Sequence, residues 1–225
     1  MKTFSKFVFA LALAAALLHA AERFDNLVRG DFFSGFAGDA TALDRAMKVC
    51  EETLAANPQH AEALVWHGSG NVFLSGQAFR KGDYARGSQL WGKGLREMDD
   101  AVALEPGRIA VLIPRGATLL NASAALPNPE QARPLLEKGV TDYEKVLAIQ
   151  KPYFDTISGH SRGELLFGLA DGYNRLNRKD QARSTFETLL SVGKASGHEA
   201  QARQWMEKGS YEKSQLSCTG CHTGK

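Results

Sequence analysis

From Ala40 onward, apolar residues recur at the three- to four-residue spacing that places them on one face of an α-helix. Proline closes several of these stretches: Pro58 follows LAAN, Pro106 follows VALE and Pro152 follows LAIQK. Proline lacks the backbone donor of a helix interior and disfavours a helical residue before it, so each position predicts a helix end. This punctuation suits helix ends better than β-hairpins, and the chain is therefore predicted to be all-α.

The closing prolines are 48 and 46 residues apart, which is a repeat period. The residues between them resemble the tetratricopeptide repeat, in which a first helix carries a large, a small and an aromatic residue and a second helix packs against it. The last unit fits best, with Leu166, Ala170 and Tyr173, then Ala182, Phe186 and Leu189. In the first unit, the first helix carries Trp66, Gly70 and Phe73, and the second carries Gly94, Met98 and Ala101 before Pro106. In the second unit, the first helix carries Leu112, Gly116 and Leu119, and the second carries Val140, Glu144 and Leu147 before Pro152. The resemblance implies an array of about three to four helix pairs.

Both earlier units are longer than the last one, and by the same amount. The last matching residue of the first helix and the first matching residue of the second are 21 positions apart in both earlier units, from Phe73 to Gly94 and from Leu119 to Val140. In the last unit the same interval, from Tyr173 to Ala182, is 9 positions. A shared expansion favours duplication of a long-helix variant, and we expect the extra residues at the turn between the two helices. An unrelated helical bundle with accidental periodicity is the alternative, and it would also be all-α.

Residues 1–21 are typical of a secretory signal peptide, because Lys2 and Lys6 precede an apolar run that ends in small residues. The run is too short to span a bilayer, so we expect export to the periplasm or secretion. Position 18 or 19, three residues before the cleavage site, holds Leu or His rather than a small residue. An uncleaved N-terminal anchor helix therefore stays an alternative.

The mature chain is predicted to begin with a lead segment at 22–39, followed by a helical repeat domain at 40–209 and a tail at 210–225. Within the domain we expect an opening helix at 40–57 and a closing helix at 197–209.

Removing the two lysines of the signal leaves 25 Lys and Arg against 25 Asp and Glu, so the mature chain is predicted to have a formal net charge of zero. No basic cluster interleaves with aromatic residues, so we expect no nucleic-acid partner and no membrane contact after signal cleavage.

The chemistry-bearing motif lies in the tail, where Cys218, Cys221 and His222 form CxxCH, the attachment pattern of c-type haem. In that class each cysteine forms a thioether with the porphyrin, and the histidine ligates the iron. Export agrees with this prediction, because such haems are attached outside the cytoplasm. A zinc site or a thioredoxin-type pair would need a second cluster or a βαβ setting, which the sequence lacks. A simple disulfide or a decayed motif stays an alternative.

The other axial ligand of the iron is predicted to come from upstream, because only three residues follow His222. His198 and Met206 share one partly apolar face of the closing helix with Ala202 and Trp205, and a flat macrocycle could pack there. We expect His198 first, since its ring could project freely near a helix start, then Met206, then an open position.

Two further patterns in the sequence are typical of a different chemistry. Gly159–Gly163 matches GxSxG, and Ser161, Asp180 and His198 follow the order of an α/β-hydrolase triad, with His67–Gly70 upstream. That mechanism needs a strand before the serine, whereas this sequence predicts a helix, so Ser161 is expected in the first turn of a helix and the protein is not expected to be an enzyme.

Two residues are assigned structural roles. Cys50 is expected to be a buried small hydrophobe. His60, at a helix start, is expected to be solvated or to cap the helix rather than to act as a ligand.

The predicted function is that of an exported c-type cytochrome with one haem c, transferring electrons to periplasmic redox proteins that dock on the helical array. The alternative is a periplasmic binding scaffold that captures peptide segments, with the haem structural, sensory or absent.

Overall fold

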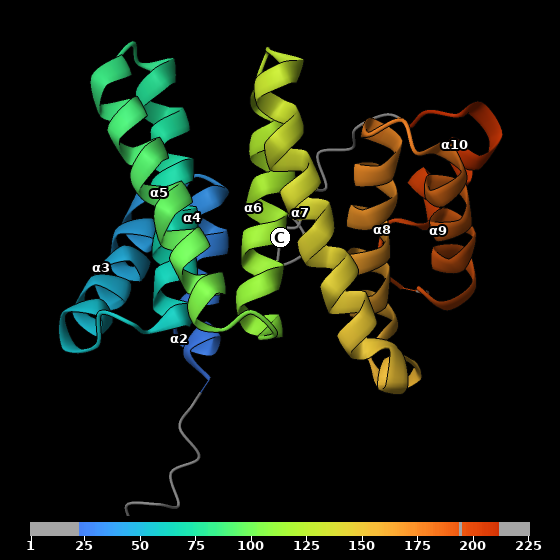
Figure 1. Ribbon diagram of the computed structural model, residues 1–225, viewed down its shortest axis with the longest axis horizontal. Coiled ribbons are helices and arrows are strands. Elements are labelled where there is room, and N and C mark those ends of the chain that lie inside the picture. Colours follow the sequence, from blue (N-terminus) through green and yellow to red (C-terminus); the bar gives the residue numbers. More distant parts are fainter. Residues whose placement is uncertain (1–22, 194, 212–225) are drawn as a thin grey trace, which may run out of the picture.

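A computed structural model of the chain describes residues 23–193 and 195–211 (Figure 1). In this part of the chain nine α-helices and one 3-10 turn are present, and no strand. They are α2 (Phe24–Phe36), α3 (Ala40–Ala56), α4 (Ala61–Arg80), α5 (Tyr84–Leu104), α6 (Ile109–Ala125), α7 (Pro129–Gln150), η1 (Lys151–Thr156), α8 (Gly159–Arg175), α9 (Lys179–Val192) and α10 (Glu199–Lys208). The all-α prediction is confirmed for these residues.

The helix ends lie where the sequence predicts them. Helices α3, α5 and α7 each end two residues before Pro58, Pro106 or Pro152. His60 caps α4, because its Nδ1 accepts a hydrogen bond of 3.1 Å from the backbone N–H of Ala63, as expected. Aspartate, asparagine or serine side chains cap α3, α5, α7 and α8 in the same way. Local sequence therefore sets most of the boundaries.

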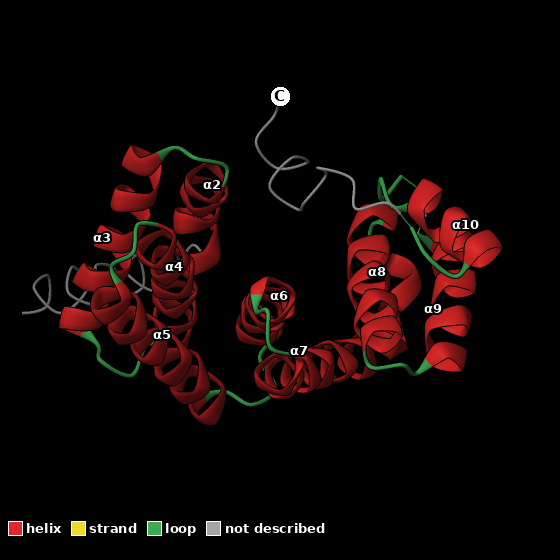
Figure 2. Ribbon diagram, turned by 90° about the horizontal axis from the view of Figure 1, so that it is seen from above, coloured by secondary structure: helices red, strands yellow, loops and turns green. Residues whose placement is uncertain are grey.

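Consecutive helices pack as pairs, α2 with α3, α4 with α5, α6 with α7 and α8 with α9, and α10 packs on α9. Neighbouring pairs meet where α4 contacts α6 and where α7 contacts α8. Viewed from above, the pairs follow an arc, with α6 and α7 between the four N-terminal helices and the three C-terminal ones (Figure 2). Each pair thus buries its apolar face against its neighbours along the chain.

The extra residues of the two longer pairs lengthen the helices and do not widen the turn. Helices α4 and α5 have 20 and 21 residues, and only 81–83 separate them. Helices α6 and α7 are joined by an equally short loop, 126–128. The expected insertion at the turn is therefore wrong, because the added residues continue the hydrogen-bonded helices and stay packed against each other.

The lead segment is also structured, since residues 24–36 form α2. Val28 and Phe32 of this helix are fully buried. The Phe32 ring stacks on Trp66 of α4, with the centroids 5.1 Å apart. Helix α2 thereby covers the end of the array and contributes to its core.

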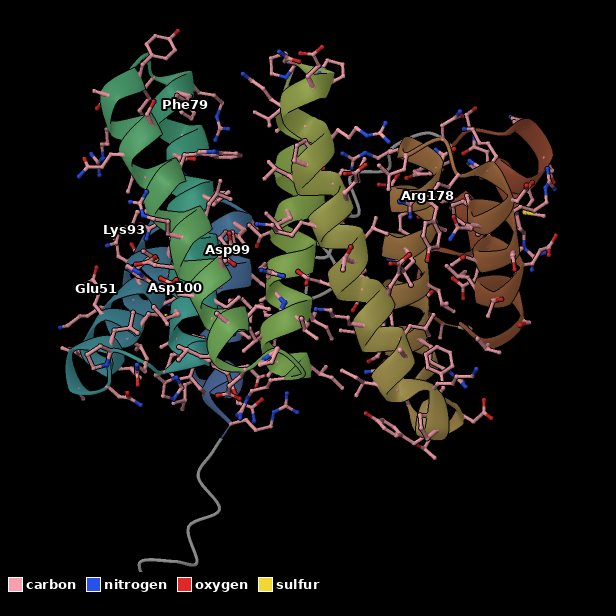
Figure 3. The ribbon with its side chains drawn as sticks, viewed as in Figure 1. Glu51, Phe79, Lys93, Asp99, Asp100 and Arg178 are labelled. Atoms are coloured by element: carbon pink, nitrogen blue, oxygen red, sulfur yellow. The ribbon has the colours of Figure 1, made fainter. Side chains whose placement is uncertain are left out.

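A buried ionic network joins the middle pair to its neighbour. Arg115 of α6 donates two hydrogen bonds, of 2.6 and 2.7 Å, to the carboxylate of the fully buried Asp142 of α7. It donates a third, of 2.9 Å, to Asp99 of α5, which also accepts from Lys138 of α7. Asp99 is labelled on α5 in Figure 3. Within 23–193 and 195–211, no helix is long and apolar enough to cross a membrane.

Candidate functional site

The predicted haem-attachment residues Cys218, Cys221 and His222 lie outside the described residues. The structure does describe the chain up to Tyr211, which is seven residues before Cys218. The site is therefore built from the point at which the tail leaves the helical array.

Tyr211 is held against α8 by both ends of its side chain. Its hydroxyl donates a hydrogen bond of 2.5 Å to Oδ1 of Asp171. Its ring lies 5.4 Å from the ring of Phe167 and 6.4 Å from that of Phe186, between centroids. Burial, and then the charge of Asp171, raise the pKa of Tyr211 above its ordinary value, so the hydroxyl stays protonated. This contact fixes the position at which the tail begins.

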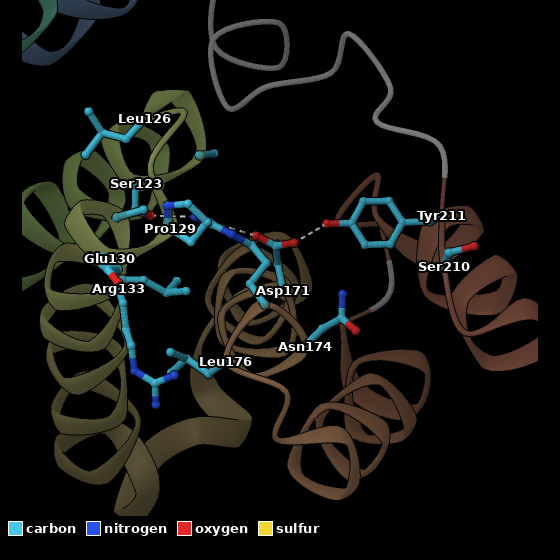
Figure 4. Close-up of a pocket in the computed structure, with 14 residues that line it drawn as sticks. Ser123, Leu126, Pro129, Glu130, Arg133, Asp171, Asn174, Leu176, Ser210 and Tyr211 are labelled. Atoms are coloured by element: carbon cyan, nitrogen blue, oxygen red, sulfur yellow. Dashed lines mark hydrogen bonds and ion pairs between the residues drawn. The ribbon is translucent and has the colours of Figure 1, made fainter.

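A cavity of about 650 Å³ lies beside this contact (Figure 4). The end of the α6–α7 hairpin forms one wall, the C-terminal half of α8 forms the middle, and Ser210 and Tyr211 form the opposite side. Its lining residues are Ser123, Ala124, Leu126, Pro129, Glu130, Ala132, Arg133, Leu136, Asp171, Asn174, Arg175, Leu176, Ser210 and Tyr211. Its volume lies within the range of small-molecule and cofactor sites, roughly 300–1,000 Å³.

The two arginines of the cavity differ in how firmly they are held. Arg175 donates to the hydroxyl of Ser123 at 2.6 Å and to the carbonyl of Leu120 at 3.0 Å, and lies 3.5 Å from the Asp171 carboxylate. Arg133 pairs at 2.9 Å with Glu137 one turn along α7, and its side chain is 66% exposed. A surface pair of this kind is weak, so the Arg133 guanidinium can exchange its partner for an anion in the cavity.

His198 lies in an aromatic cluster and not at a free surface. Its ring stacks on Phe167 with 4.2 Å between centroids and 11° between the planes, and its Nδ1 lies 3.1 Å from the side-chain oxygen of Gln201. The residue is only 6% exposed. The expectation that the ring projects freely is wrong, because the turn before α10 folds it onto α8.

The face of α10 on which a macrocycle was expected is covered by the protein itself. Ala202 and Trp205 are buried, and the Trp205 ring lies 4.9 Å from that of Phe186 of α9. The Trp205 indole N–H donates to Asn174 of α8 at 3.1 Å. Met206 is half-buried at the edge of this contact. A flat group therefore has no room between this face and α8 and α9.

The GxSxG pattern lies at the start of a helix, as expected. Ser161 is exposed in the first turn of α8, where its backbone N–H donates to the hydroxyl of Ser158 at 3.1 Å. His67 lies inside α4, where its Nδ1 is 3.0 Å from the Glu97 carboxylate. In the described part of the chain, no strand leads into Ser161, so the elbow that a hydrolase needs is missing there.

The third cysteine is inert. Cys50 is fully buried in α3, as expected. Burial, with smaller effects of Glu51 and Glu97, raises the pKa of its thiol to about 12. A thiol of this kind is neither a nucleophile nor a metal ligand near neutral pH. Among residues 23–193 and 195–211, no cluster of histidines, cysteines and carboxylates has the arrangement of a metal site.

Sequence reasoning missed Tyr211 and the cavity. Tyr211 is the one aromatic residue among polar and small residues in the stretch GSYEKSQ, which is the only feature of the sequence that sets it apart there. The cavity could not be found in this way, because its walls come from three separate segments, 123–136, 171–176 and 210–211. Comparisons with protein-family models, curated proteins and solved structures find no match to this chain.

Proposed function

We propose that the protein is an exported c-type cytochrome that carries one haem c on its C-terminal tail. The motif at 218–222 is the observation on which this rests, because it combines two cysteines three positions apart in the sequence with a histidine that follows directly. Cys218 and Cys221 form the thioethers, and His222 is the proximal iron ligand. The haem supplies one-electron redox chemistry.

Two features of the described residues support this proposal. Cys50 is buried with a raised pKa, so it does not compete with Cys218 and Cys221 for a vinyl group. Tyr211 ties the start of the tail to α8, and Cys218 follows it by seven positions in the sequence. The cavity next to Tyr211, whose lining includes four charged side chains as well as leucines, lies beside the point at which the tail begins.

The distal ligand is proposed to be Met206 or His198, with an open position as the third possibility. The 16 residues from Met206 to His222 span up to roughly 50 Å, so reach permits either residue. Ligation by His198 would require the imidazole to leave its stack on Phe167 and its contact with Gln201. Met206 is half-buried at the surface of α10 and needs a smaller rearrangement. The packing therefore supports Met206 ahead of His198.

The helical array is proposed to be of the tetratricopeptide type and to dock periplasmic redox proteins. The large and small residues of the resemblance support this, because Leu166, Ala170 and Tyr173 are buried where α8 packs on its neighbours. Such arrays present extended surfaces to protein partners. The proposed role is electron transfer between the tail haem and a partner held on this surface.

A second candidate is a periplasmic scaffold that captures peptide segments, in which the haem is structural, sensory or absent. It is favoured by Tyr84, the first residue of α5, whose ring centroid lies 6.3 Å from that of Phe79 at the end of the α4–α5 hairpin. The Tyr84 side chain is 69% exposed, the largest value for a large apolar side chain among the described residues. A rigid exposed aromatic residue of this kind is suited to a protein contact.

The test is expression of the full chain together with a cytochrome c maturation system. We expect haem that stays on the polypeptide in a denaturing gel and a reduced-minus-oxidised spectrum with sharp α and β bands. Cys218→Ser with Cys221→Ser should give a folded, colourless protein, whereas the control Cys50→Ala should keep the haem. A colourless parent protein would reject the cytochrome and leave the binding scaffold.

A further inference from the structure

We infer that the cavity between the α6–α7 hairpin and α8 binds a small organic acid, a molecule with one carboxylate and a short apolar body. Such a site goes beyond the proposed function and does not depend on it, because every group that forms it lies in the described part of the chain. The volume of about 650 Å³ leaves room for a ligand of this size.

Asn174 of α8 offers unused hydrogen-bond donors to the cavity. Its side-chain oxygen accepts a hydrogen bond of 3.1 Å from the indole N–H of Trp205 and one of 2.6 Å from the ammonium of Lys179. Both neighbours can only donate, so the amide oxygen must face them and the NH2 group must face away. Within 23–193 and 195–211, no residue accepts from this NH2 group. A half-buried donor of this kind favours a ligand with acceptor oxygens.

Arg175, also on α8, is held so that part of its guanidinium stays open. Its Nη1 donates to the carbonyl of Leu120 at 3.0 Å and to Asp171 at 3.5 Å, and its Nη2 donates to Ser123 at 2.6 Å. A guanidinium has five N–H donors, so one on Nη2 and the one on Nε have no partner among the described residues. The protein therefore holds a positive charge in place before any anion arrives.

The charges around the cavity favour an anion over a cation (Figure 4). Asp171 uses both of its oxygens, because Oδ1 accepts from Tyr211 and Oδ2 from Arg175. Glu130 is exposed in the first turn of α7, where water and salt screen its charge. Arg133 on the same helix has a weak surface pair and adds a cation that can change partner. The unused groups are thus mainly donors and cations, which suit a carboxylate and not an ammonium.

Apolar side chains supply the rest of the lining. Leu126 and Pro129 come from the end of the α6–α7 hairpin, and Ala132 follows on α7. The buried side chains of Leu136 and Leu176 lie at the base. A short alkyl chain gains free energy by leaving water against these groups, whereas a fully polar anion such as inorganic phosphate does not. The lining therefore favours an organic acid over an inorganic anion.

Three probes separate these chemistries in the full-length protein. Hexanoate has a carboxylate and a short apolar chain, hexylammonium has a chain of similar length with the opposite charge, and inorganic phosphate has the charge without the chain. Broadening of the ligand signals in nuclear magnetic resonance gives each Kd, and the side-chain amide signal of Asn174 in isotope-labelled protein locates the site. We expect hexanoate to shift this signal and to bind about ten-fold more tightly than the other two probes.

Two polar variants test the donors. Asn174→Asp keeps an oxygen that accepts from Trp205 and Lys179 but replaces the NH2 group by a charged oxygen, so hexanoate binding should be lost. Arg133→Gln removes the exchangeable cation and should weaken hexanoate binding about three-fold. Its control, Lys48→Gln, removes a cation from an exposed helical pair and should leave the Kd unchanged. Far-ultraviolet circular dichroism shows that each variant is folded.

A third variant tests the cavity itself. Ala132→Trp fills the space from α7 and should abolish hexanoate binding, whereas Ala103→Trp, at an exposed position of α5, should keep it. If Ala132→Trp does not fold, the two polar variants decide.

Three results would overturn the organic-acid site. They are no binding of hexanoate, binding of phosphate as tight as that of hexanoate, and hexanoate binding that Asn174→Asp leaves at the parent level. None of them bears on the cytochrome, because covalent haem is measured separately. A colourless protein that binds hexanoate at Asn174 would reject the cytochrome and keep this site.

Discussion

Replacing Tyr211 by phenylalanine removes one hydroxyl and leaves the ring in its cluster, so it measures how strongly the tail is anchored. The hydroxyl donates at 2.5 Å to the Asp171 carboxylate. A hydrogen bond to a charged group contributes about 1.5–3 kcal/mol, and we take about 2 because the site is only partly buried. Detachment of the tail from α8 should then be favoured about 30-fold.

Chymotrypsin measures this detachment, because it cleaves after both tyrosine and phenylalanine and requires the side chain to leave its contacts. Under conditions in which opening and closing are fast, the cleavage rate follows the population of the open form. Tyr211→Phe should therefore be cut at this position roughly 30-fold faster than the parent, after correction for the intrinsic rate in a short peptide. Tyr84→Phe, at an exposed site, should show no change. Equal corrected rates for Tyr211→Phe and the parent would refute the anchoring role.

Three further predictions concern the array. Gly94→Ala should lower the free energy of unfolding by about 1–3 kcal/mol, because the new Cβ would lie 2.5 Å from a backbone carbonyl of α4. In the control Gly30→Ala the new Cβ meets nothing within 4 Å, so this change should be neutral or stabilising. Urea titration of both variants compares the two effects. Asp142→Asn should lower the free energy of unfolding by about 3 kcal/mol in the same titration, because it leaves the buried Arg115 with Asp99 as its one carboxylate partner. A decrease of less than about 1 kcal/mol would contradict the importance of this network. At high pH, the unfolded chain loses the Tyr211 proton near pH 10.0, whereas the folded chain keeps it because the pKa is raised. The free energy of unfolding should therefore fall as the pH rises above 10.0, and it should fall less in Tyr211→Phe. Urea midpoints of both proteins at pH about 8 and about 11 measure this change.

Helix boundaries were predictable because they depend on a few adjacent residues. Proline ends helices through its own ring and missing donor, and His60 caps α4 through a contact three residues away. The burial of Cys50 was predictable for the same reason, since it follows from the apolar face of a single helix. Each of these features needed no knowledge of which helices are neighbours.

The features that escaped prediction depend on tertiary contacts. Residues 22–39 were predicted only as a lead segment, because the contact that gives α2 its place in the core, between Phe32 and Trp66, forms only when the fold brings the two helices together. His198 stands at a helix start, where rings often face solvent, but the preceding turn lays it on Phe167. The cavity likewise needs three separate segments to meet.

The contact between Tyr211 and Asp171 has a kinetic consequence. Any group carried on Cys218 is confined to within roughly 25 Å of the array, whatever path the connecting residues take. Confinement of that kind corresponds to an effective concentration in the millimolar range or above for anything bound to the helices. A partner that docks on the array with modest affinity then reacts with the tethered group as an intramolecular neighbour, and the rate is governed by how long the partner stays.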